Sequence, residues 1–251
     1  MRSVTVRRYG RGARWLHALV YTGVLTELVT GAWFVLIGYE AGFVVGLTDV
    51  HEYAGFALTA VVLGGIVVGI RGARTFLAES VRFRRSDLRW FRHWPAGLRT
   101  GRFAYHDGHF DPGQRLANLV MVVLLAILLA SGVGAMYLPG PFGIAVFQAH
   151  RFAAYAITPV LLGHIVIAAG ILPGYRGVWR SMHLGGRLPE EVAERIWPGW
   201  LAGYRAAGTD RSGGYAIGAG SAEPGTGRAP TPGLRTWRGL WRARSGSARK
   251  S

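Results

Sequence analysis

The sequence predicts an all-α, membrane-embedded protein whose four spanning helices form an up-down-up-down bundle. Its composition is the first observation behind this prediction: 50% of the 251 residues are hydrophobic and only 17% are charged. With a mean hydropathy of +0.23, the chain is too apolar for a soluble domain of this length. The second observation is that the apolar residues gather in four runs, each long enough to cross a bilayer.

The third observation is the distribution of charge. The formal net charge is +16, from 29 Lys and Arg against 13 Asp and Glu. A soluble protein with this balance would suggest nucleic-acid binding, but here the basic residues lie in blocks between apolar runs. These blocks alternate with loops at 38–50 and 139–148 that contain no Lys or Arg. By the positive-inside rule both termini and segment 71–113 are cytoplasmic, so we expect an inner-membrane protein in contact with lipid, and no nucleic-acid partner.

The chain divides in order into an arm, a membrane domain, a helix and a tail. We expect a basic cytoplasmic arm over 1–14, the membrane domain over 15–175, an amphipathic cytoplasmic helix over 176–205 and a disordered basic tail over 206–251. The tail is rich in Gly, Ser, Pro and Thr and cannot bury a core. Within the membrane domain the spanning helices are expected at 15–37, 51–70, 115–138 and 149–172.

The fourth span organises the functional argument because it contains His150 and His164. They lie 14 residues apart, close to four turns of about 3.6 residues, so both point to one side at depths about 21 Å apart. A metal-binding side chain within a membrane helix is costly and usually functional. His17 lies near the cytoplasmic end of the first span and His51 at the outer end of the second. Depth therefore pairs His51 with His150 near the outer face and His17 with His164 near the inner face.

Two imidazoles from different helices, one on each side of the iron, are the axial ligands of a low-spin b-type haem. The four histidines His17, His51, His150 and His164 therefore predict two haem b groups, each held through its iron by one pair. The absence of Cys excludes thiolate ligation, covalent CxxCH attachment and Cys-ligated iron–sulfur clusters. Zinc also binds neutral imidazole, but the axial distance between His150 and His164 prevents convergence on one ion. A haem-free membrane anchor or small transporter is the alternative from a different functional class.

Small and acidic residues within the spans add to this interpretation. Gly31, Gly55 and Gly132 would leave bare helix surface for a porphyrin, or would serve ordinary helix packing. Glu27, in the middle of the first span, is expected to hydrogen-bond within the bundle or to tune the inner haem; a neutral buried Glu with a local partner is the alternative. The remaining histidines lie in polar segments and are expected to be exposed to solvent: His93, His106, His109 and His183.

Four stretches carry a resemblance to a known family. They are RWLHALVYTGVLTELVTG, VHEYAGFALTAVVLGGIVVGIR, FDPGQRLANLVMVVLLAILLASGV and AHRFAAYAITPVLLGHIVIA, and SMHLGGRLPEEVAERIWPGWLAGYR follows them. Over residues 7–205 the chain resembles the gamma subunit of membrane-bound formate dehydrogenase, the cytochrome b556 type, within the broader prokaryotic cytochrome b561-like group. The resemblance implies two b haems with ligands at the four histidines named above. It also implies an electron-transfer subunit that does not itself oxidise the substrate.

The resemblance further implies an iron–sulfur partner subunit fed by a catalytic dehydrogenase subunit, and a membrane quinone, menaquinone or ubiquinone, as electron acceptor. Its quinone segment matches Asp111, Gly113 and Gln114, where the family commonly reads Asn-Ala-Gly-Gln and this chain reads Asp-Pro-Gly-Gln. An ionised Asp can only accept hydrogen bonds. Asp111 would therefore be protonated, donate through water, or cap the helix that follows. Cytochrome b subunits of nickel–iron hydrogenases or of thiosulfate or polysulfide reductases are the competing assignments.

Overall fold

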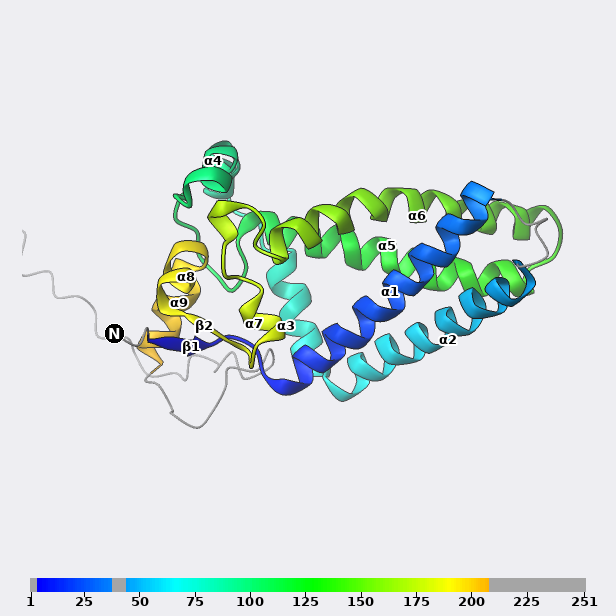
Figure 1. Ribbon diagram of the computed structural model, residues 1–251, viewed down its shortest axis with the longest axis horizontal. Coiled ribbons are helices and arrows are strands. Elements are labelled where there is room, and N and C mark those ends of the chain that lie inside the picture. Colours follow the sequence, from blue (N-terminus) through cyan, green and yellow to red (C-terminus); the bar gives the residue numbers. More distant parts are fainter. Residues whose placement is uncertain (1–3, 38–43, 208–251) are drawn as a thin grey trace, which may run out of the picture. The chain divides into compact units, whose positions relative to one another are not determined.

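Four long helices dominate the computed structural model, which describes residues 4–37 and 44–207 (Figure 1). They are α1 (Arg11–Ile37), α2 (Val44–Val68), α5 (Pro112–Tyr137) and α6 (Gly140–Ala168). All four are long and apolar enough to cross a membrane. At most 11% of the most apolar 18-residue window of each is buried within the protein. Apolar surface exposed on this scale requires lipid around it. The predictions of an all-α protein and of a multi-pass membrane protein are confirmed.

The long helices pack as two hairpins, α1 along α2 and α5 along α6. In Figure 1 the chain runs out along α1, returns along α2, and repeats this course along α5 and α6. We call the end at which α1 and α5 begin the basic end. The Arg-rich segments lie there, because they precede α1, connect α2 to α5 and follow α6. The short helices α3 (Ile70–Ser80) and α4 (Asp87–Thr100) lie between the two hairpins in sequence.

The second spanning helix begins at Val44 rather than at 51. The fourth spanning helix differs from the expected span at both ends. It begins at Gly140 rather than 149, because Pro141 fits the first helical turn, where an N–H would have no partner. It ends at Ala168 rather than 172 because Gly170 adopts a left-handed φ of 70°. The backbone amides of Gly170 and Ile171 then donate to the carbonyls of Ile167 and Val166, a Schellman cap. His150 consequently lies well inside this helix rather than at its start, whereas His164 lies about one turn before its end.

The segment after α6 is not the single amphipathic helix expected over 176–205. It forms the 3₁₀ turn η1 (Pro173–Tyr175), α7 (Arg180–His183), β2 (Arg187–Pro189), α8 (Glu190–Ile196) and α9 (Pro198–Ala206). Gly185 and Gly186 take φ values of 71° and 77°, which end α7, while Pro189 and Pro198 interrupt helical hydrogen bonding. The expected disordered tail over 206–251 lies outside the described residues from 208 onwards.

A small apolar core joins this segment to the N-terminal arm. The strand β1 (Thr5–Arg7) pairs antiparallel with β2, and Val6 lies opposite Leu188. Leu188, Ile196 and Leu201 are almost fully buried there. Part of the arm that the sequence predicted as a plain basic extension is therefore a structured part of the basic end.

Candidate functional site

Two pairs of imidazoles lie between the spanning helices. The ring centroids of His51 on α2 and His150 on α6 are 6.2 Å apart. Those of His17 on α1 and His164 on α6 are 6.4 Å apart. The structure thus brings together the residues that depth along the helices paired in the sequence. In each pair the two rings come from different helices, and α6 contributes one ring to both pairs.

The spacing of each pair fits a metal ion between two rings. An imidazole nitrogen lies about 2 Å from the metal that it binds, and its ring centroid lies about 1 Å farther away. Two imidazoles on opposite sides of one iron would thus have centroids roughly 6 Å apart. Among residues 4–37 and 44–207, no group of three or more His, Cys, Asp or Glu side chains is arranged to hold a metal ion. Each pair therefore offers a metal ion two protein ligands, and its remaining ligands would have to come from a cofactor.

Hydrogen bonds determine which nitrogen of His51 is free. The hydroxyl of Thr30 donates to the carbonyl of Thr26 at 2.8 Å, and its oxygen lies 2.7 Å from His51 Nδ1. A hydroxyl has one hydrogen, so Thr30 must accept from His51 Nδ1–H. This leaves the lone pair of His51 Nε2 free to bind a metal.

The same arrangement occurs at His150. Ser131 donates to the carbonyl of Ile127 at 2.6 Å and lies 3.1 Å from His150 Nδ1. The carbonyl of Leu128, also 3.1 Å from Nδ1, can only accept. His150 therefore carries its hydrogen on Nδ1 and leaves Nε2 free. A hydrogen-bonded second nitrogen is the usual condition of a metal-binding imidazole.

Glycines follow both hydroxyl residues and face the same rings. A Cβ on Gly31 would lie 3.5 Å from His51 Cε1, and a Cβ on Gly132 would lie 3.3 Å from His150 Cε1. Gly31 lies 14 residues after His17, which places the two residues on nearly the same face of α1 at depths about 21 Å apart. It therefore faces His51, at the other depth, rather than His17.

Glu27 also belongs to the His51 pair rather than to the His17 pair. Its Oε2 lies 3.1 Å from His51 Nδ1, and 19% of its side chain is exposed. Glu27 thus makes a polar contact within the bundle, as expected. The suggestion that Glu27 tunes the inner site is wrong, because Glu27 lies one helical turn before Thr30 and reaches the same imidazole. Gly55 on α2 leaves room for the carboxyl group, 3.8 Å from where its Cβ would lie.

The His17–His164 pair has a different environment, at the basic end. The ring of His183 on α7 lies 6.3 Å from that of His17 and 6.1 Å from that of Tyr21. A pocket of about 170 Å³ adjoins His17, and Arg14, Trp15, Ala18, Tyr21, Met182 and His183 complete its lining. Nothing in the sequence indicated the position of His183, because it depends on how the segment after α6 folds back.

The three residues expected at a quinone site all lie at the start of α5. Asp111 Oδ1 accepts from the Gln114 backbone amide at 2.8 Å, so the helix-cap interpretation of Asp111 is confirmed. Burial raises the pKa of the Asp111 carboxyl. Gln114 Oε1 accepts from Trp197 Nε1 at 3.1 Å, and Gly113 packs against Trp90. None of the three lines the pocket beside His17.

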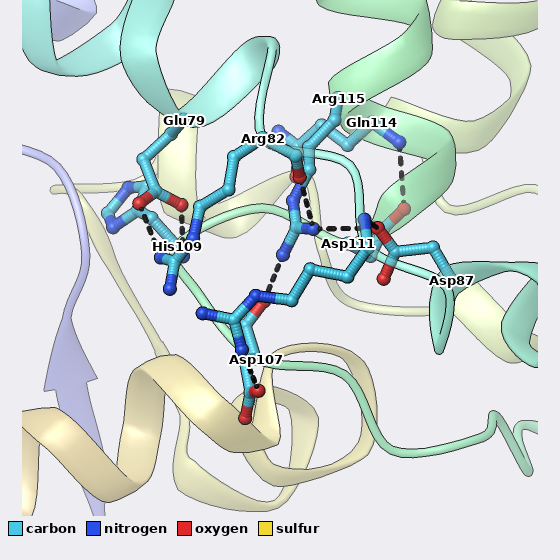
Figure 2. A network of polar contacts seen from close by, with 9 residues as sticks. Glu79, Arg82, Asp87, Asp107, His109, Asp111, Gln114 and Arg115 are labelled. Carbon is cyan, nitrogen blue, oxygen red and sulfur yellow. Dashed lines mark hydrogen bonds and ion pairs between the residues drawn. The ribbon is translucent and has the colours of Figure 1, made fainter.

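A network of polar side chains surrounds that helix start (Figure 2). Arg115 pairs with Asp87 at 3.1 Å, and both side chains are nearly inaccessible to solvent. Arg115 also donates to the carbonyls of Arg82 and Asp107. Glu79 accepts from Arg82 and from the backbone amide of His109. Loop 101–111 is thereby tied to α3, α4 and α5.

Two of the histidines expected in solvent lie inside this region. His106 is 2% exposed, and its Nε2 donates to the carbonyl of Ile196 at 2.7 Å. His109 packs against Phe110 and Trp200, and burial, followed by the nearby positive charge of Arg8, holds its pKa well below its usual value. The expectation was wrong for these two residues because α8 and α9 cover the loop that carries them. His93 and His183 are exposed, as expected.

Arg8 links the N-terminal arm to the same region, a role that sequence reasoning missed. Its side chain is completely buried, and its guanidinium lies 3.6 Å from the ring centroid of Trp197 and 4.6 Å from that of Trp200. It donates to the carbonyl of His109 at 2.5 Å. In the sequence Arg8 is one of several basic residues in the arm, and nothing distinguishes it from the others.

Comparison with protein families decides the assignment. The family model described as prokaryotic cytochrome b561 matches residues 8–185, a range that includes all four spanning helices and all four paired histidines. The chain belongs to the prokaryotic cytochrome b561 family. Cytochromes of this family are membrane proteins of electron transfer that bind haem b. No curated protein matches the chain. The paired imidazoles, with Nε2 free in the His51–His150 pair, fit the family's cofactor.

Proposed function

We propose that this b561-family cytochrome holds two haem b groups. His51 and His150 would bind one iron, and His17 and His164 the other. The observation that carries the proposal is the pair of centroid distances, 6.2 and 6.4 Å, each between rings of different helices. The Nδ1 hydrogen bonds of His51 and His150 support it, because they point Nε2 away from protein acceptors.

Haem, when bound, supplies a one-electron redox centre at each pair. The protein's own contribution is to hold the ligands at fixed depths. His150 and His164 are 14 residues apart on one continuous helix, about 21 Å along its axis, so α6 sets the distance between the two sites. Thr30 and Ser131 orient the imidazoles of the first pair.

We further propose that the protein is the membrane subunit of a respiratory formate dehydrogenase. Its electrons would come from an iron–sulfur partner subunit that receives them from a catalytic dehydrogenase subunit, and would pass to a membrane quinone. The alternation of basic and uncharged connections supports an orientation with both termini in the cytoplasm of an inner-membrane protein. The donor would then dock near the His51–His150 pair, and the quinone would bind near the basic end.

For the quinone we retain the segment with Asp111, Gly113 and Gln114. Its support is the resemblance of that segment to the family's quinone segment. Gln114 would have to exchange its contact with Trp197 for one with the quinone, since a single amide oxygen serves both. Asp111 would remain the cap of α5.

The first test is a count of haem per chain in detergent-purified protein, from the reduced-minus-oxidised spectrum and the pyridine haemochrome. We expect two b haems in the natural chain and one in each of His51→Ala and His164→Ala. His93→Ala is the matched control, because His93 is exposed on α4, and it should retain two. A natural chain without haem would refute the electron-transfer proposal. If His51→Ala and His164→Ala each retained two haems, the ligand assignment would be refuted.

The donor is tested separately in membrane vesicles that contain the whole complex. Formate should reduce the haem α band of this cytochrome, and added quinone should reoxidise it. Reduction by hydrogen gas but not by formate would refute the dehydrogenase assignment and favour a hydrogenase partner, while leaving the two-haem proposal intact.

A further inference from the structure

In each of the two spanning hairpins, a hydroxyl residue followed by a glycine contacts the ring of a histidine on the second helix. In α1 the dipeptide Thr30–Gly31 faces His51, which lies 21 residues after Thr30. In α5 the dipeptide Ser131–Gly132 faces His150, which lies 19 residues after Ser131. In each case the hydroxyl accepts from Nδ1–H and the glycine leaves room for the ring. The two imidazoles of this pair are therefore held in closely similar ways.

The two arrangements differ in the residue that lies three positions before the hydroxyl residue. Three residues before Thr30 the chain has Glu27, whose carboxyl oxygen lies 3.1 Å from His51 Nδ1. Three residues before Ser131 it has Leu128, which offers His150 only its backbone carbonyl, at 3.1 Å. One imidazole of the pair therefore has an acidic side chain beside it, and the other has neutral acceptors.

The surroundings of Glu27 direct its carboxyl group at His51. Oε1, the other carboxyl oxygen, is buried and has no hydrogen-bond partner among the described residues. Gly55 leaves space beside both oxygens. Among the described residues, no other polar contact draws the carboxyl group away from the imidazole, so its contact with His51 explains the position of Glu27.

We propose that Glu27 is a positioning residue that lowers the reduction potential of the haem at the His51–His150 pair, relative to the haem at the His17–His164 pair. This inference rests on the two-haem function proposed above. An acceptor on the far nitrogen makes a ligand imidazole more electron-donating, and hydrogen bonding around axial ligands is one of the means by which a protein sets haem potential. When Glu27 is ionised, its negative charge beside the ligand favours the oxidised, more positive iron. The effect is enlarged in a membrane interior, where screening is weak.

This asymmetry would give electron flow a direction. A lower potential at the His51–His150 pair would make transfer from there to the His17–His164 pair favourable. That is the direction required if the iron–sulfur donor docks near the first pair and the quinone binds at the basic end.

The test is a potentiometric titration of the two haems in the natural chain and in Glu27→Gln, followed by optical and electron paramagnetic resonance spectra. Gln preserves size and an acceptor oxygen but removes the negative charge. The haem that is missing from His51→Ala identifies the first site in the spectra. We expect that haem to be about tenfold more reduced at a fixed ambient potential, equal to 59 mV for one electron. The other haem should not shift.

Two further variants make the test specific. Glu27→Leu reproduces the residue found at the equivalent position of α5 and should shift the same haem in the same direction. Glu52→Gln is the control. Glu52 follows His51 in the sequence, but the polar contacts of His51 within the described residues are with Thr30 and Glu27. This variant should leave both potentials unchanged.

Each outcome decides one of the two proposals. A natural chain without two haems refutes the proposed function. Two haems whose potentials are unchanged in Glu27→Gln, or that shift equally, refute the role of Glu27 alone. Loss of one haem from Glu27→Gln, with helix content preserved, also refutes it and makes Glu27 a structural support of the site.

Discussion

Leucine at position 132 would test whether the space beside His150 belongs to a cofactor site. A Cβ there would lie 3.3 Å from His150 Cε1 and 3.5 Å from Nδ1. The first distance is tighter than ordinary van der Waals contact, and the remaining three carbons of leucine need further room beside the ring. His150 would have to turn away from the position in which Ser131 accepts from its Nδ1.

The size of the effect follows from the cost of overpacking. Forcing extra methylenes into a filled site costs about 1 to 3 kcal/mol, which corresponds to roughly 5- to 150-fold weaker binding of the cofactor. We therefore expect Gly132→Leu to lose most of one haem on purification in detergent and to retain the other. Gly132→Ala needs a shift of only a few tenths of an ångström and should retain both, with an altered α band. The measurement is the haem content per chain by pyridine haemochrome.

Gly64→Leu is the matched control. It lies in the apolar part of α2, and a Cβ there would meet nothing within 4 Å. It should keep two haems. If Gly132→Leu also keeps two haems with the spectrum of the natural chain, the argument from the space beside His150 is refuted.

Three further predictions concern the basic end, each measured by thermal unfolding in detergent. Asp87→Asn should destabilise the fold by about 3 kcal/mol, because it leaves the buried Arg115 guanidinium without its ion-pair partner. Asp107→Asn, which breaks an exposed ion pair, should destabilise it by about 1 kcal/mol or less. Equal losses of stability in the two variants would refute the argument from burial. Arg8→Ala should cost about 2 kcal/mol or more, since its desolvated guanidinium stacks on two indole rings, and an unchanged melting temperature would contradict this. Because burial and Arg8 lower the pKa of His109 from 6.5, the folded state binds fewer protons than the unfolded state below that pH. Stability should therefore fall as the pH drops through 6.5, and the fall should be smaller in His109→Gln; an identical pH profile in that variant would refute the role of His109.

Much of the membrane architecture could be predicted from the sequence, because a spanning helix requires only sufficient length and hydropathy within one continuous segment. The length and hydropathy of the apolar runs predicted four spanning helices, and their limits agree with the structure to within a few residues at most ends. The exceptions are the start of α2, at Val44 rather than 51, and the start of α6, where an apolar segment with two prolines was taken for a loop. Proline in a helix interior removes one backbone hydrogen bond, whereas in the first turn no hydrogen bond is lost.

The depth of each histidine in the membrane could also be predicted from the sequence, because it depends only on the position of the residue along its own helix. At about 1.5 Å per residue, a residue number converts directly to a depth, and depth sufficed to pair His17 with His164 and His51 with His150. The identity of the cofactor needed more than depth. It rests on the family and on the spacing of the rings, which the structure supplies.

What only the tertiary structure decided was rotation about the helix axes and the folding of the basic end. Periodicity relates residues on one helix to each other but cannot say which neighbour they face, so Glu27 was assigned to the wrong histidine pair. His106 and Arg8 looked like solvated polar residues, because their burial arises from contacts with segments about 90 and 190 residues away in the chain. The sequence thus determined which residues share a depth in the membrane, whereas packing between helices and between distant loops decided which of them touch.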